Sequence, residues 1–109
     1  DPEGYLYVVD RIKNMFISGG ENVYPVEVER VILKHSDVSE VAVVGVPDAQ
    51  WGEVGKAFVV AKNNMTSEDL KTHCKSLLAR FKVPKIVVFV DELPKNDAGK
   101  IDRKALKSA

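Results

Sequence analysis

Apolar and polar residues alternate along this chain of 109 residues in blocks that predict its strands and helices. Blocks rich in β-branched and aromatic residues predict strands at residues 5–9, 15–17, 38–46, 55–61 and 86–90. We expect the first two to pair as an N-terminal hairpin and the next two to pair antiparallel. The loop that joins the latter pair carries the only tryptophan, Trp51.

Two stretches place apolar residues at the spacing of an α-helix. In the earlier one, Val28, Val31 and Ile32 share one face. The later one begins at Thr66, whose hydroxyl can accept a hydrogen bond from the Asp69 amide as a helix cap. Its predicted apolar face consists of Leu70, Cys74, Leu77, Leu78 and Phe81.

The order of these elements predicts an α+β fold. We expect an N-terminal β-hairpin and a three-stranded sheet packed by two main helices, followed by a short C-terminal helix. A chain of 109 residues is long enough for one core. No apolar run reaches the length of about 20 residues that a membrane span needs, so we expect no membrane span.

Charge and cysteine content narrow the possible partners. The 16 basic and 16 acidic residues give a net charge of zero. They are unevenly spread, because residues 1–79 carry a net charge of −4 (8 basic, 12 acidic) and residues 80–109 carry +4 (8 basic, 4 acidic). This predicts a localised anionic partner and no nucleic acid, whose binders are more often basic overall. The single Cys74 excludes an internal disulfide and fits a reducing, cytoplasmic compartment.

Candidate chemistry appears in residues 93–103. Asn96 and Gly99 favour a tight turn, and Asp102 can cap the short C-terminal helix. Lys100 would then lie on an exposed loop, where its ammonium group is a mobile point charge suited to a carboxylate or a phosphate. The alternative is an ordinary solvated lysine, and the loop alone does not decide between the two.

Two long motifs resemble signatures of the acyl-adenylate-forming enzymes. This superfamily contains acyl-CoA synthetases, peptide-synthetase adenylation domains and luciferases. The first motif is DRIK at residues 10–13, continued as SGGENVYPVEVE at 18–29, and the second is PKNDAGKI at 94–101. Their order and spacing are those of the family. The resemblance covers essentially the whole chain and identifies it as the small C-terminal domain of such an enzyme, without the large N-terminal domain that precedes it.

The resemblance implies a reaction in two steps. A carboxylate first attacks ATP to give an acyl-adenylate and pyrophosphate, and a thiol, usually that of CoA, then displaces AMP. ATP and CoA are therefore the expected substrates, and Mg²⁺ is expected in the full-length enzyme but not on this domain. Lys100 matches the catalytic lysine of the first step, which offsets the repulsion between the carboxylate and the phosphates.

The resemblance also implies that the domain rotates between the two steps. Residues 1–17 would form a hinge-proximal hairpin and residues 18–109 the mobile domain, with the large N-terminal domain as partner. Lys13 matches the hinge, and Arg11 matches the residue that contacts the ribose of the adenylate. The loop that would line the tunnel for the pantetheine thiol contains Gly19, Gly20 and Glu21.

Three residues match positions at which CoA-using relatives bind the CoA nucleotide: Trp51, Phe81 and Lys85. Val83 departs from the pattern, because some relatives have a basic residue there. The alternative is that the rings of Trp51 and Phe81 pack into the core or against the large domain.

An acyl-CoA synthetase is the favoured interpretation. A carrier-protein-loading adenylation enzyme or a luciferase-like relative is a close alternative, and a non-catalytic α+β binding module is an alternative from another class. The sequence does not identify the acid, because the acyl pocket of these enzymes belongs to the large domain.

Overall fold

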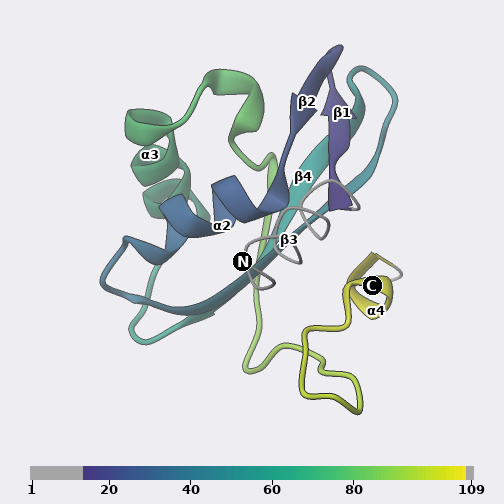
Figure 1. Cartoon of the computed structure of the whole chain (residues 1–109). Coiled ribbons are helices and arrows are strands. Elements are labelled where there is room, and N and C mark those ends of the chain that lie inside the picture. Colours follow the sequence, from purple (N-terminus) through teal and green to yellow (C-terminus); the bar gives the residue numbers. More distant parts are fainter. Residues whose placement is uncertain (1–13, 108–109) are drawn as a thin grey trace, which may run out of the picture.

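A five-stranded sheet forms the centre of the computed structural model, which describes residues 14–107 (Figure 1). Its strands are β1 (Phe16–Ser18), β2 (Glu21–Val23), β3 (Val38–Asp48), β4 (Gly52–Ala61) and β5 (Ile86–Phe89). The helices are α2 (Pro25–Leu33), α3 (Ser67–Leu77) and α4 (Arg103–Lys107), and a short 3-10 helix, η1 (Arg80–Lys82), follows α3. The predicted α+β class is confirmed, as is the predicted order of helix, two strands, helix, strand and short helix from α2 to α4.

β4 is the central strand of the sheet. It pairs antiparallel with β3 along its whole length, as predicted, and parallel with β5 on its other side. β1 joins β4 through the pair of Ser18 and Gly52, and β2 lies outside β1. The two short strands therefore extend the predicted three-stranded sheet to five strands.

The hairpin of β1 and β2 differs from the sequence prediction. A glycine loop was expected after residue 17, but the chain turns at Gly19 and Gly20 alone, with φ values of 59° and 83°. Two successive positive φ values match the twist of a hairpin, so the flanking residues can pair at once. The predicted partner strand at residues 5–9 lies outside the described residues. The division into residues 1–17 and 18–109 stays a prediction, although β1 spans that boundary.

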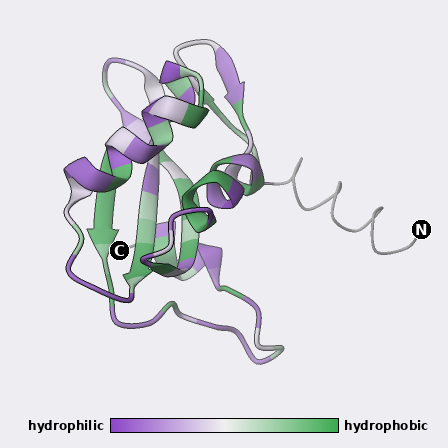
Figure 2. Ribbon diagram, turned by 90° about the vertical axis from the view of Figure 1, so that its left-hand side faces the viewer, coloured by the Kyte–Doolittle hydropathy of each residue, from purple (hydrophilic) through white to green (hydrophobic). Residues whose placement is uncertain are grey.

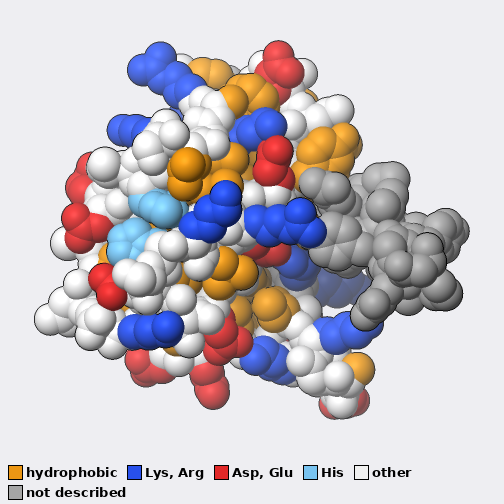
Figure 3. Space-filling model, turned by 60° about the vertical axis from the view of Figure 1, so that its left-hand side comes forward, with side chains coloured by type: hydrophobic (Ala, Val, Ile, Leu, Met, Phe, Trp, Pro, Cys, Tyr) orange, Lys and Arg blue, Asp and Glu red, His pale blue; other side chains and the backbone are white. Residues whose placement is uncertain are grey.

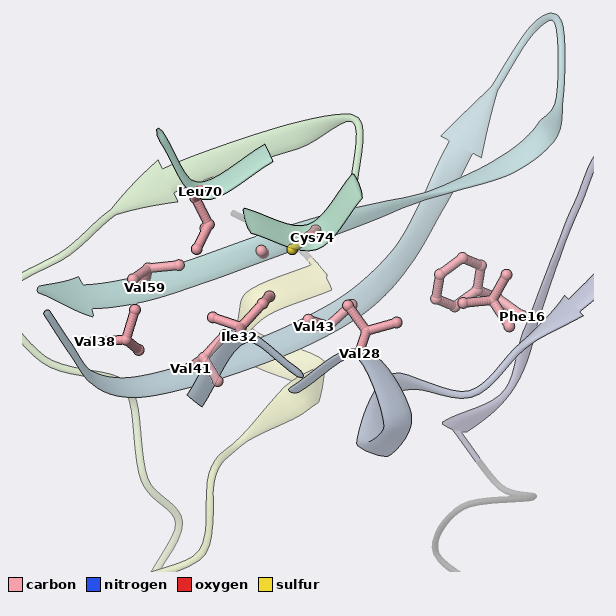
Figure 4. Packing of buried hydrophobic residues seen from close by; sticks show 11 residues of the cluster. Phe16, Val28, Ile32, Val38, Val41, Val43, Val59, Leu70 and Cys74 are labelled. Carbon is pink, nitrogen blue, oxygen red and sulfur yellow. The ribbon is translucent and has the colours of Figure 1, made fainter. Parts of the chain in front are cut away.

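Helices α2 and α3 cover one face of the sheet (Figure 1). α2 starts with Pro25 and buries the predicted stripe of Val28, Val31 and Ile32. α3 starts with the predicted cap, in which Thr66 and Asp69 bond each other's amides. The core between helices and sheet (Figure 4) consists of Phe16, Val23, Val28, Ile32, Val38, Val41, Val43, Ala57, Val59, Leu70 and Cys74.

The end of α3 was predicted incorrectly. The helix ends at Leu77, because Leu78 adopts an extended backbone (φ −123°, ψ 152°). Leu77, the last residue of the helix, is 50% exposed and is not part of the apolar face. The chain then forms η1, where Lys82 pairs with Glu27 of α2 at 2.8 Å and Phe81 packs against the core. These tertiary contacts outweigh the helical period of the sequence.

The opposite face of the sheet is covered by the C-terminal segment. Side chains alternate along a strand, so Ala42, Val44 and Phe58 point away from the helices. They form a second buried cluster with Leu93 and Leu106, which flank the predicted lysine loop. Figure 2 shows hydrophobic residues concentrated in the strands and hydrophilic ones in the connecting loops. Within residues 14–107, no helix is both long and apolar enough to cross a membrane.

Phe16 rests on two glycines that face each other across β3 and β4, Gly45 and Gly55. A Cβ atom at Gly45 would lie 2.5 Å from the Phe16 side chain, whereas one at Gly55 would lie 3.4 Å from it. We expect Gly45→Ala to lower the free energy of unfolding by about 1–3 kcal/mol, because the core has no room for the methyl group. Urea unfolding of the 109-residue chain measures this. Gly55→Ala is the matched control and should cost less; an equal loss in both would contradict this packing.

Cys74 is fully buried, and burial raises the pKa of its thiol from 9.0 to about 11. The thiol ionises near pH 9 once the chain unfolds, but stays protonated in the folded protein. The unfolded state therefore holds fewer protons between these values, and stability should fall as pH rises from about 9 to 11. The urea midpoint of the chain should drop between pH 8 and pH 10.5. The drop should be smaller in Cys74→Ala; an identical drop would mean that other groups cause it.

Candidate functional site

Lys100 lies on a tight hairpin turn, as predicted. The Asn96 amide donates to the Lys100 carbonyl oxygen at 2.8 Å, and Lys95 and Ile101 form an isolated bridge at the base. The side-chain oxygen of Asn96 accepts from the amides of Ala98 (2.9 Å) and Lys100 (3.1 Å). The loop is thus held in shape by its own bonds. The Lys100 side chain is exposed, and no carboxylate within residues 14–107 pairs with it.

The base of this turn is attached to the second face of the sheet. Leu93 and Leu106 are each 3% exposed in the second cluster. The Asp102 amide donates to the Pro94 carbonyl oxygen at 2.9 Å, and the Asp102 carboxylate caps α4 by accepting from the Ala105 amide at 3.2 Å, as predicted. Residues 94–100 are exposed, whereas Leu93 before them and Leu106 after them are buried.

A bidentate ion pair joins α4 to α2, and sequence analysis did not find it. The Arg103 guanidinium donates to both carboxylate oxygens of Glu29, at 2.9 and 3.1 Å, and to the Val43 carbonyl oxygen at 2.8 Å. The only available signal was that Glu29 ends the first motif and Arg103 lies just past the second. Neither residue's type or spacing indicates that they meet.

The glycine turn and the tryptophan loop are in direct contact. The Gly19 amide donates to the Trp51 carbonyl oxygen at 2.9 Å. A Cβ atom at Gly19 would lie 2.7 Å from the Trp51 ring, so only glycine lets the turn pack on the indole. Asp48 fixes the loop by accepting from the Trp51 amide at 2.8 Å. Of the other predicted loop residues, Gly20 and Glu21 are exposed beside this contact.

Two of the three predicted nucleotide contacts come together. The Lys85 ammonium lies 4.9 Å from the centre of the Trp51 ring, which is 39% exposed. Phe81 instead packs against the core, with Lys82 5.7 Å from its ring centre. The tryptophan thus offers an accessible aromatic face beside a cation, whereas Phe81 is partly buried against the core and its contact with a nucleotide stays a prediction.

A basic pocket of about 420 Å³ lies between α3 and the segment before β5. It is lined by Lys71, Lys75, Arg80, Val83, Pro84 and Lys85. Figure 3 shows Lys and Arg side chains spread over this side of the molecule. Of these cations, only Lys85 was predicted from the sequence. The four-residue spacing of Lys71 and Lys75, which places them on one side of α3, was the available signal for those two. Four cations around one hollow can bind phosphate groups.

A smaller polar pocket of about 330 Å³ lies between the ends of α2 and α3. It is lined by His35, Asp37, Asn64, Met65, Asp69 and Thr72. His35, which lines this pocket, and the neighbouring His73 are both engaged with the backbone. His35 Nδ1 accepts from the Asp37 amide at 3.1 Å, and His73 Nε2 lies 2.7 Å from the Val31 carbonyl oxygen. Among the described residues, no group of three His, Cys, Asp or Glu side chains is placed to hold a metal ion.

Two predicted site residues, Arg11 and Lys13, lie outside the described residues. Their roles at the ribose and at the hinge therefore stay predictions.

Comparison with known proteins places this geometry in a family. The family described as "AMP-binding enzyme C-terminal domain" matches residues 27–100. The long-chain-fatty-acid–CoA ligase FadD13 of Mycobacterium tuberculosis is 53% identical over 98% of this chain, and the 2-succinylbenzoate–CoA ligase of Listeria monocytogenes is 48% identical over 98%. The chain spans only 22% and 23% of their lengths.

Solved structures give the same result. A Mycobacterium tuberculosis fatty acyl CoA synthetase superposes with a TM-score of 0.85 at 48% identity, over 90% of this chain and 20% of that one. The o-succinylbenzoate CoA synthetase MenE of Bacillus subtilis, in complex with its acyl-adenylate intermediate, superposes with a TM-score of 0.85 at 42% identity, over 92% and 21%. The fold, both motifs and these relatives agree, and the chain belongs to the family of AMP-binding enzyme C-terminal domains.

Proposed function

We propose that this chain is the mobile C-terminal domain of a longer, ATP-dependent acyl-CoA synthetase. The relatives that match nearly all of it are CoA ligases, of whose length it covers about a fifth. A large N-terminal domain would supply the acyl pocket and most ATP contacts. Mg²⁺, where ATP requires it, would be held by that other part of the enzyme.

In the proposed first half-reaction, Lys100 enters the site of adenylation. A substrate carboxylate oxygen attacks the α-phosphorus of ATP, the bond to the bridging oxygen breaks, and pyrophosphate leaves. The reacting groups are both anionic, so an ammonium between them lowers the barrier by offsetting their repulsion. The exposed tip of the Asn96–Lys100 turn can enter a cleft while its base remains on the sheet.

In the proposed second half-reaction, the surface around Gly19 and Trp51 takes the place of Lys100. The position of the two candidate sites is the observation that carries this proposal. Lys95 at the base of the lysine turn pairs with Glu40 near the start of β3, whereas Trp51 follows the end of that strand. The eight steps along the chain from Glu40 to Asp48 span about 26 Å of extended strand. Both sites can therefore face one reaction centre only in turn, through rotation about a hinge that we assign to Lys13.

We propose that the CoA nucleotide binds along Trp51, Lys85 and the basic pocket beside them. The indole face can stack on adenine, and the cations can pair with phosphates as charge-assisted partners. The pantetheine arm would then pass over the turn at Gly19 and Gly20. Arg11 would contact the ribose of the adenylate.

A carrier protein in place of CoA remains the second candidate. Val83 in the pocket lining is apolar where some CoA-using relatives are basic, and Phe81 is partly buried in the core. Both observations reduce the number of nucleotide contacts. The basic pocket favours CoA.

Lys100→Ala in the longer enzyme should lower adenylation by roughly 10²–10³-fold, the usual cost of removing one preorganised electrostatic group. Pyrophosphate release with ATP and the cognate acid measures this step. Thioester formation from preformed acyl-adenylate and CoA should be largely retained. Lys104→Ala, which removes a lysine on α4 beyond the turn, is the control; equal losses in both half-reactions would assign Lys100 a structural role.

Trp51→Ala and Lys85→Ala should each raise the KM for CoA while sparing adenylation. Stacking on one base is worth about 1–3 kcal/mol, so Trp51→Ala should raise the constant by roughly 5- to 100-fold. Lys62→Ala removes an exposed lysine outside the basic pocket and serves as the matched control. An unchanged KM in both site variants would favour the carrier-protein candidate.

A further inference from the structure

The Lys100 turn is rigid within itself, but its orientation depends on how its base is attached. The bonds among residues 96–100 join the turn only to itself. The direction in which Lys100 projects is therefore set by the residues on either side of the turn. A reacting group displaced by about 1 Å can lose roughly 10²-fold in rate, so this attachment matters for chemistry as well as for folding.

Two of the contacts that attach the base of the turn to the sheet are poorly suited to fixing the direction of Lys100. Leu93 and Leu106 are buried, but apolar contacts are non-directional and tolerate small shifts. The ion pair of Lys95 with Glu40 is a single contact of 3.0 Å, and both side chains are more than 40% exposed. Exposed single pairs of this kind contribute little.

The third attachment has a fixed geometry. Arg103 forks onto both oxygens of Glu29, and their side chains are only 20% and 12% exposed. The same guanidinium donates to the Val43 carbonyl oxygen, and the Val43 amide donates to Glu29 at 2.8 Å. A planar fork on a carboxylate restricts both distance and angle, which a lysine cannot do.

These bonds also satisfy the backbone groups of one residue, Val43, on the outer edge of the sheet. Among residues 14–107, β3 has a neighbouring strand on one side only, so the outward-facing amide and carbonyl of Val43 bind no strand of the described sheet. Glu29 satisfies the amide and Arg103 satisfies the carbonyl. One point on β3 thus ties together α2, the sheet and the start of α4, three residues after Lys100 in the chain.

We propose that Arg103 and Glu29 are positioning residues for the adenylation step. They hold the base of the Lys100 turn in one orientation against the edge of β3, so that its ammonium group reaches the carboxylate and phosphates in the required geometry. Neither residue touches substrate; both act through Lys100. This inference rests on the proposed function, and in particular on the role of Lys100.

The test uses two conservative variants of the longer enzyme. Arg103→Lys keeps the charge and loses the fork, and Glu29→Gln keeps the shape and an acceptor for the Val43 amide but loses the charge. The rate of adenylation, measured as pyrophosphate release, should fall by roughly 10- to 100-fold in each variant. The loss should appear in kcat more than in the KM for ATP. Thioester formation from preformed acyl-adenylate and CoA should be essentially unchanged, which also reports that the domain is folded.

Lys95→Ala is the matched control, because it removes the exposed ion pair from the same segment, and it should leave both half-reactions near wild type. Selective loss in Lys100→Ala, with wild-type adenylation in Arg103→Lys and Glu29→Gln, would overturn the positioning role alone. Equal losses of both half-reactions in the two variants would overturn it in favour of a purely structural role. Equal losses of both half-reactions in Lys100→Ala would overturn the proposed function and the positioning role with it.

Discussion

The long hairpin of β3 and β4 buries apolar side chains on both of its faces, and this constraint arranges everything else in the domain. One face carries Val41, Val43 and Val59, which only the helices α2 and α3 can cover. The other carries Ala42, Val44 and Phe58, and left uncovered these would form an exposed apolar patch. The chain covers them with its own C-terminal segment, which is why a long loop bearing Lys100 is anchored on this sheet.

The same hairpin separates the two candidate sites. Its length places the base of the lysine turn near the start of β3, while the glycine turn and Trp51 lie at its far end. The paired strands β3 and β4 lie between the two sites and hold them apart. An enzyme that uses both surfaces at one reaction centre must therefore move the domain as a whole.

Polar contacts fix the orientation of the C-terminal segment on the sheet, which apolar burial alone does not fix. The second cluster holds the C-terminal segment to the sheet, but Arg103 and Glu29 determine where on the edge of β3 it sits. The cost of removing these two charges from water is offset because each has further hydrogen-bond partners. The carboxylate binds the guanidinium and a backbone amide, and the guanidinium also binds a backbone carbonyl. A buried pair with this many partners favours one arrangement over its near neighbours.

Local sequence signals determined most of the elements. The stripe of Val28, Val31 and Ile32 predicted α2, the cap of Thr66 and Asp69 predicted the start of α3, and the apolar runs predicted β3, β4 and β5, because periodicity and capping are properties of neighbouring residues. The turn at Lys100 was equally readable, since Asn96 and Gly99 act within the turn. The resemblance to a family then gave Lys100, Gly19 and Trp51 their candidate roles.

Contacts between residues far apart in the chain were decided only by the tertiary structure. The helical period continued past Leu77, yet the helix stops there while Phe81 and Lys82 pack against α2 and the core. The glycine turn packs on Trp51, and Lys71 and Arg80 join Lys85 around one pocket. Glu29 and Arg103, 74 residues apart, meet at the edge of β3. No local sequence pattern predicts such an ion pair, because the two side chains meet only after the sheet has formed and brought both of them to the backbone of Val43.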